Sequence, residues 1–183
     1  MITITEALAE IPTIEKRIIK KQDFIKNCLY RPATARDQFE ADGGATKLIY
    51  REMQSIHDLQ ERLVKIRAAI SKANSENTIT VEDQTRTIAD WLTWRREISA
   101  KEQRFIMELL GQINNMRRQA TMKGLPVTTT DTGYSEQMVV NMDERMLAAD
   151  VEQLEIVLGA LDGQLSLKNA TITLDLDTKT IDL

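Results

Sequence analysis

Apolar residues recur at intervals of seven along this chain, and this repeat constrains the fold more than any other feature. One row of aliphatic side chains occupies the middle of the first half, namely Ile49, Ile56, Leu63 and Ile70, with Leu59, Ile66 and Ala73 as companions. A second row lies near the C-terminus, namely Leu147, Leu154 and Leu161, interleaved with Val151, Leu158 and Leu165. Paired rows at this spacing form the seam by which long helices pack side by side. The repeat therefore predicts helices in contact along their lengths.

Composition supports a helical fold for the rest of the chain. Of the 183 residues, 42% are hydrophobic but only 4% are aromatic, which suits aliphatic helix packing better than a sandwich or barrel. We predict an all-α fold, an elongated antiparallel four-helix bundle with coiled-coil-like packing, as one body over residues 1–169. The expected helices span about residues 5–30, 45–73, 81–118 and 143–168.

Two local signals bear on where these helices begin. Pro12 interrupts the first pattern, so that helix either kinks there or begins at Thr13. Thr80 is followed three residues later by Asp83, an arrangement similar to a capping box. We therefore expect the third helix to start immediately after Thr80.

The C-terminal tail, residues 170–183, changes to the alternating pattern of a β-strand. Ile172, Leu174 and Leu176 alternate with polar residues and form the expected apolar face. Because a lone strand is unstable in water, this one needs a partner. The candidates are the segment around Val127, the N-terminal residues Ile2 and Ile4, or an edge strand of another subunit. The three alternating residues are therefore candidate interface residues.

Two tryptophans lie close together in the third expected helix. Trp91 fits the apolar seam and is predicted to be buried in the core. Trp94 and the neighbouring Arg95 are candidate interface residues, since tryptophan and arginine are enriched at the centres of protein interfaces. Between Gly124 and Gly133 the chain has no helical period, and residues up to Asn141 are expected to be extended.

Residues able to carry out catalysis or bind metal are scarce. The single histidine, His57, could share a helix face with Glu61. A zinc site needs three or four ligands, and Cys28 is the only other histidine or cysteine in the sequence. Phosphate-binding glycine loops and the nucleophile elbow are absent from the sequence. We predict no catalytic residue, no metal site and no cofactor. One alternative stays open, an enzyme that binds phosphate or a nucleotide with the loops around Arg31 and Thr128.

Charge and hydropathy bear on partners and location. The formal net charge is −4, with acidic and basic residues mixed along the helices, so nucleic-acid binding is not expected. The sequence contains neither a signal peptide nor an uncharged apolar run long enough to span a bilayer. We expect a soluble cytoplasmic protein that does not act at a membrane.

Three short segments resemble the septicolysin-like bacterial helical proteins. The opening Ile4-Thr5-Glu6-Ala7-Leu8-Ala9-Glu10 with Ile14-Glu15-Lys16-Arg17-Ile18 looks like the start of that family. The run Ile70-Ser71-Lys72-Ala73-Asn74-Ser75 and the segment Leu165-Ser166-Leu167-Lys168-Asn169 are similar to its second-helix exit and its closing helix. The strand from Thr171 to Leu183 departs from the family pattern. The resemblance implies an antiparallel helical bundle and, from the family name, a membrane-active alternative with no active residue to carry over.

The preferred hypothesis is a non-enzymatic structural or assembly protein. It would self-associate, or bind other structural proteins, through its helix faces and its C-terminal strand, as a component of a phage or prophage virion. The seams and the tail support this hypothesis, because both are surfaces that another chain could cover.

Overall fold

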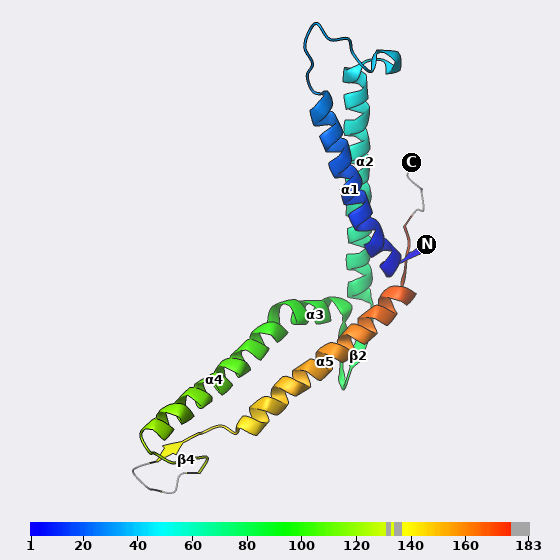
Figure 1. The fold of residues 1–183 in the computed structure, drawn as a ribbon. Helices are drawn as coiled ribbons and strands as arrows, with labels where there is room; N and C mark the ends of the chain where they lie inside the picture. The colour runs from blue at the N-terminus through cyan, green and yellow to red at the C-terminus, as the bar shows by residue number, and fades with distance from the viewer. Residues whose placement is uncertain (131–132, 134–136, 177–183) are drawn as a thin grey trace. The chain divides into compact units, whose positions relative to one another are not determined.

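A computed structural model describes residues 1–130, 133 and 137–176 of the chain. The chain consists of long helices with only short strands, so the prediction of a helical body with a small β element is confirmed (Figure 1). Its contacts divide it into two compact units, where the sequence analysis expected one body at residues 1–169. Unit 1 comprises Met1–Glu76 and the chain from Ser166 onward, and unit 2 comprises Asn77–Leu165. The two units are described separately.

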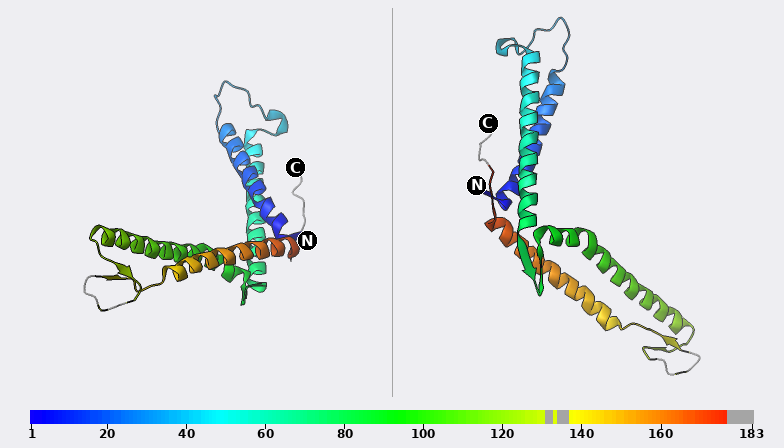
Figure 2. Two further views of the ribbon diagram at one scale, coloured as in Figure 1. Left: turned by 60° about the horizontal axis from the view of Figure 1, so that its bottom comes forward. Right: turned by 180° about the vertical axis from the view of Figure 1, so that it is seen from behind.

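Unit 1 is built on an antiparallel pair of helices, α1 (Ile4–Cys28) and α2 (Ala45–Glu76), which lie side by side in both views of Figure 2. The sevenfold repeat of α2 forms the contact as predicted. Leu59, Ile66 and Ala73 are buried in the core, and Ile56, Leu63 and Ile70 pack against its edge. From α1 the core receives Ile4, Ala7, Ile14 and Ile18. The helix pair therefore encloses a single aliphatic seam.

Ion pairs flank this seam and join the two helices. Lys21 Nζ lies 2.6 Å from Glu52 Oε2, and Arg62 Nε lies 2.9 Å from Glu10 Oε1. Partly exposed pairs of this kind contribute little to stability, typically about 0–1 kcal/mol each. These ion pairs favour one register of the two helices, because sliding one helix along the other would separate the charges.

Of the two alternatives considered for Pro12, a helix that begins at Thr13 is wrong, because helix α1 includes Pro12. It starts at Ile4 and continues through Pro12, whose side chain is exposed. A capping box fixes the start, since the Glu6 backbone N–H donates to Thr3 Oγ1 at 3.2 Å and the Thr3 backbone N–H donates to Glu6 Oε2 at 2.7 Å. The two bonds from Thr3, first from its backbone N–H and then from its hydroxyl, lower the pKa of the Glu6 carboxyl.

Replacing Thr3 by alanine is expected to lower the free energy of unfolding by about 1 kcal/mol at neutral pH, the usual effect of losing a cap. Because the folded-state pKa of Glu6 is lowered, its contribution is present above the ordinary carboxyl pKa and is lost as pH falls through the folded value. The difference between wild type and Thr3→Ala should therefore shrink in acid. Urea denaturation at several pH values measures it. Thr13→Ala, on the same helix, is the control, because the Thr13 hydroxyl donates to the Ala9 carbonyl within the helix at 3.4 Å and does not cap its start.

The chain ends of unit 1 form a short ladder. Strand β1 (Ile2–Thr3) pairs antiparallel with β6 (Thr173–Leu174), with Ile2 opposite Leu174. The Ile4 N–H donates to the Ile172 carbonyl at 3.1 Å and extends the ladder by one bond. Of the partners considered for the tail, the N-terminal segment is therefore the one observed. The last residues of the predicted tail, 177–183, lie outside the described part of the chain.

Unit 2 begins with a β-hairpin, where the sequence analysis expected the third helix from residue 81. Strand β2 (Thr78–Val81) pairs antiparallel with β3 (Gln84–Thr87), and Glu82 in the turn has a φ of 51°. The predicted start was wrong because Ile79 and Val81 follow a strand alternation and both are buried on one face. The true cap is Thr87, which accepts a hydrogen bond from the Asp90 N–H at 3.1 Å.

The third helix is continuous but changes geometry along its length. It comprises α3 (Ile88–Thr93), a π-helical stretch η2 (Trp94–Ser99) and α4 (Ala100–Met122). The Ser99 hydroxyl, in a buried residue, donates to the Arg95 carbonyl at 2.8 Å within the π-helical stretch. π-Helical stretches are rare overall and are frequent at functional sites.

Helix α5 (Glu144–Thr171) runs antiparallel to α4, as Figures 1 and 2 show. Within unit 2, its Leu147 and Leu154 pack with Ile106 of α4 in a small core. Two short parallel strands, β4 (Val127–Thr128) and β5 (Met138–Val139), lie in the connection between the helices. The prediction of extended backbone before Asn141 is confirmed at these two strands, and residues 131–132 and 134–136 of the predicted segment lie outside the described part of the chain. In unit 1, the connection between α1 and α2 contains one short 3-10 helix, η1 (Glu40–Asp42).

Candidate assembly surfaces

The apolar side chains of the tail are buried against their own unit. Leu174 is 3% exposed and Leu176 is 8% exposed, and both belong to the core of unit 1, with Ile172 packed at its edge. These three residues were predicted as interface candidates. In the structure they pack with α1 and α2 of the same chain, so the described part of the tail, up to Leu176, directs these apolar side chains into its own unit.

The other two predicted interface residues lie at the π-helical stretch of unit 2. Trp94 is half-buried and meets Trp91 edge to face, with ring centres 5.5 Å apart. Trp91 is buried as predicted. Arg95 is exposed, and its Nη1 lies 2.7 Å from Oδ1 of Asp162 on α5. Both residues therefore make contacts inside unit 2, and Arg95 helps to hold α5 beside the third helix.

A cavity of about 330 Å3 lies beside Trp94 in unit 2. Trp91, Ile106 and Leu154 supply apolar lining. The acidic side chains of its lining are Glu82, Glu102 and Asp150, against one arginine, Arg86, whose guanidinium lies over the Trp91 ring at 4.9 Å. An excess of carboxylates repels phosphate, so the cavity does not support the phosphate-binding alternative.

The loop residues considered for phosphate each donate to backbone carbonyls of their own loop. In unit 1 the Arg31 guanidinium donates to the backbone carbonyls of Ala35 and Pro32. In unit 2 the Thr128 hydroxyl donates to the Thr130 carbonyl at 2.9 Å. Each side chain therefore stabilises its own loop.

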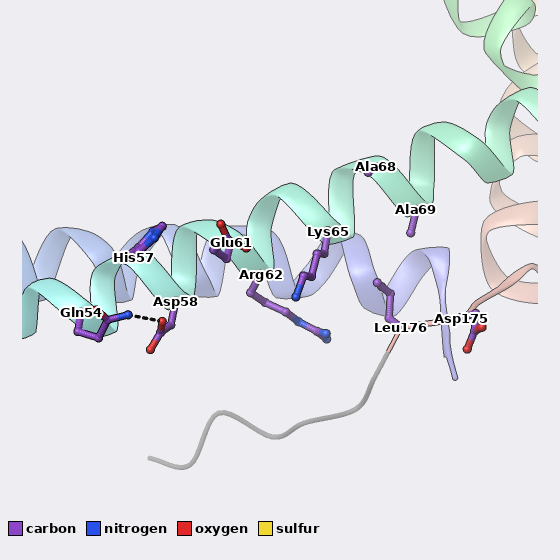
Figure 3. Close-up of a pocket in the computed structure, with 10 residues that line it drawn as sticks. All are labelled: Gln54, His57, Asp58, Glu61, Arg62, Lys65, Ala68, Ala69, Asp175 and Leu176. Carbon is purple, nitrogen blue, oxygen red and sulfur yellow. Dashed lines mark hydrogen bonds between the residues drawn. The ribbon is translucent and has the colours of Figure 1, made fainter.

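An open groove of about 900 Å3 runs along the polar face of α2 in unit 1. Figure 3 shows His57, Glu61, Arg62 and Lys65 along this helix, with Asp175 and Leu176 at one end of the groove. Arg62 points to its pairing partner Glu10 on α1, and Gln54 donates to Asp58 at 2.9 Å. His57 and Glu61 do share a face, but within the described part of the chain no three potential ligands gather to hold a metal ion.

Helix α5 carries a second row of residues that are small or apolar except for one glutamine, and the sequence analysis did not identify it. We call it the outer row and define it by seven residues spaced alternately four and three apart, namely Ala149, Gln153, Ile156, Ala160, Gly163, Leu167 and Ala170. The inner row, which contains Leu147, Leu154 and Leu161, lies on the opposite side of the helix and is buried. All seven residues of the outer row are exposed.

The outer row is open at its apolar and glycine positions, whereas its one polar member, Gln153, donates to Glu82 Oε1 of the hairpin at 2.6 Å and lines the cavity beside Trp94. Ile156 is 52% exposed and Leu167 is 59% exposed. A Cβ atom built on Gly159 or Gly163 would have no described atom within 4 Å beyond the local helix backbone. Surface helices normally carry charged residues opposite their buried face, and a helix that is apolar on both faces is typical of one buried on both sides. In the sequence, the outer row could have been recognised from the sevenfold spacing of Ala149, Ile156, Gly163 and Ala170.

Comparison of the chain with known protein families, with curated proteins and with solved structures gave no match. No helix in residues 1–130 or 137–176 is long and apolar enough to cross a membrane. What the chain does is therefore inferred from its own surfaces.

Proposed function

We propose that this chain is a non-enzymatic structural protein that self-associates through its helix faces, of the kind that serves as a subunit in a phage or prophage particle. The observation that carries the proposal is the exposed outer row of α5. Scattered single apolar residues on a surface are ordinary. An exposed row at coiled-coil spacing whose members other than Gln153 are small or apolar is what a partner helix covers.

Other helices of both units add apolar side chains to the surface. In unit 1, Ile19 of α1 and Val64 of α2 are exposed, and in unit 2 Phe105 of α4 is exposed. Each unit is built on a single pair of helices, which buries only one face of each helix. Association of copies would cover more of this surface without a change of fold. The proposed contact does not involve the tail strand, because Leu174 and Leu176 are buried in unit 1 and Ile172 packs against the same core.

The expected result is a native mass that is a multiple of the 20.8 kDa chain and that rises with protein concentration. Analytical ultracentrifugation over a wide concentration range, supported by native mass spectrometry, measures it. A mass of one chain at every concentration would contradict self-association.

The resemblance to septicolysin-like proteins leads to a second candidate, a membrane-active protein. The observation in its favour is the same exposed outer row, since an apolar helix face can insert at a lipid surface. Release of a trapped dye from liposomes tests it, at neutral and at acidic pH. Intact liposomes at both would exclude this candidate.

A further inference from the structure

We propose that the outer row of α5 pairs with the outer row of a second copy of this chain, antiparallel, in a twofold-symmetric contact centred near residue 158. The inference rests on the proposed self-association and assigns it a surface, a partner and an orientation. The row has the alternating three- and four-residue spacing that keeps one face of a helix against a partner helix.

The order of large and small residues along the row favours an antiparallel pair. With the twofold axis near residue 158, Ile156 of each copy lies opposite Ala160 of the other, and Leu167 lies opposite Ala149. Gln153 falls at the level of Gly163, at the edge of the row, where its amide donates to Glu82 of its own unit. The Ile156 and Leu167 layers then each contain one larger and one smaller side chain, so the helices keep a constant separation there.

A parallel pair would fit less well. Ile156 would meet Ile156 and Leu167 would meet Leu167, whereas Gly163 would meet Gly163. Layers of such different width leave a void at the glycines or force the helices apart at the isoleucines. The sequence of the row is therefore self-complementary in one direction only.

Charges beside the row are compatible with the antiparallel register. On the flanks, Glu152 falls opposite Ser166 of the second copy, and Asp150 falls opposite Gln164. Acidic residues therefore do not face one another at these positions, although the chain as a whole is negatively charged. A copy of the same chain thus fits the row in charge as well as in shape.

The contact should be weak by itself. From Ala149 to Leu167 the helix rises about 27 Å, and a contact about 10 Å wide along it covers about 270 Å2 of each copy. Standard stable interfaces cover about 800 Å2 of each partner. We therefore expect a dissociation constant in the micromolar range or above, and a dimer that forms only at high concentration.

The first test places a charge in the middle of the row. Ala160→Glu is expected to raise the dissociation constant about 100-fold, because two carboxylates would be buried against Ile156 of the opposite copies. Ala148→Glu is the matched control, since Ala148 is exposed on the same helix but lies off the row. Ultracentrifugation measures association, and circular dichroism checks that both variants keep their helices.

The second test reports orientation. In a Cys28→Ser background, chains with Ile156→Cys are mixed with chains carrying Ala160→Cys and oxidised. An antiparallel pair brings these two positions into one layer, so the mixed disulfide should form preferentially. A parallel pair would instead link Ile156→Cys chains to one another, and that result would overturn the proposed orientation.

The outcomes separate this inference from the proposed function. If wild type associates but Ala160→Glu associates equally well, the chain self-assembles through another surface and the outer row is not the contact. If wild type stays a single chain at every concentration, both proposals fail. Dye release from liposomes that Ala160→Glu abolishes and Ala148→Glu preserves, without association of wild type, would assign the row to lipid and overturn the pairing.

Discussion

Replacing Trp91 by alanine is expected to lower the free energy of unfolding of unit 2 by about 3–5 kcal/mol. Trp91 is 2% exposed and is among the largest fully buried side chains of the described residues. Its indole N–H donates to the Ile79 carbonyl at 3.2 Å, which ties β2 to α3. The substitution would leave a cavity and also a buried carbonyl without its donor.

Two further variants separate these contributions. Trp91→Phe keeps much of the apolar volume but loses the donor, so its cost should be smaller than that of alanine. Trp94→Ala removes a half-buried ring that touches Trp91 from the side and should cost less still. Urea denaturation followed by circular dichroism measures all three, and Trp94 fluorescence reports on unit 2 in the Trp91 variants. A loss below about 1 kcal/mol for Trp91→Ala would show that the hairpin and helix are held together elsewhere.

The helices could be predicted from the sequence because their repeat is a property of single segments. Leu59, Ile66 and Ala73 are spaced by seven and form one side of α2 whatever that helix packs against. The same holds for Leu147, Leu154 and Leu161 on α5. Helix ends were less certain, because a cap is defined by a single residue and several threonines could supply it.

The β-hairpin shows this ambiguity. Thr80 with Asp83 and Thr87 with Asp90 both have a threonine followed three residues later by an aspartate. Only Thr87 caps a helix, since Ile79 and Val81 are buried as strand residues. The alternation of polar and apolar residues in β2 covers only four residues, which is too short to predict a strand against the competing capping signal of Thr80 and Asp83.

The candidate site could be predicted only in part. The tail was identified as a strand, but its partner lies at the other end of the chain, and no local pattern specifies so distant a pairing. The outer row of α5 was present in the sequence yet overlooked, because the more apolar inner row accounted for the helix. Only the exposure of Ile156 and Leu167 shows that the apolar side chains of this row are left uncovered within the described residues.

Leu174→Ala is expected to lower the free energy of unfolding of unit 1 by about 2–5 kcal/mol, the usual cost of emptying a buried leucine site. Leu174 is 3% exposed, lies opposite Ile2 across the ladder and belongs to the same core as Ile66. Losing its side chain therefore weakens the contact that joins the two ends of the chain to the helix pair. Thr173→Ala, exposed on the same strand, is the matched control and should cost far less.

Urea denaturation measures the loss, and hydrogen exchange locates it. The Ile4 amide donates to the Ile172 carbonyl, so its exchange should quicken in Leu174→Ala but not in Thr173→Ala. If the strand instead acted mainly as an assembly arm, Leu174→Ala would reduce the native mass and leave the stability of unit 1 unchanged. Burial in the core of its own unit argues for the opposite result, a destabilised unit 1 whose folded fraction still associates through α5.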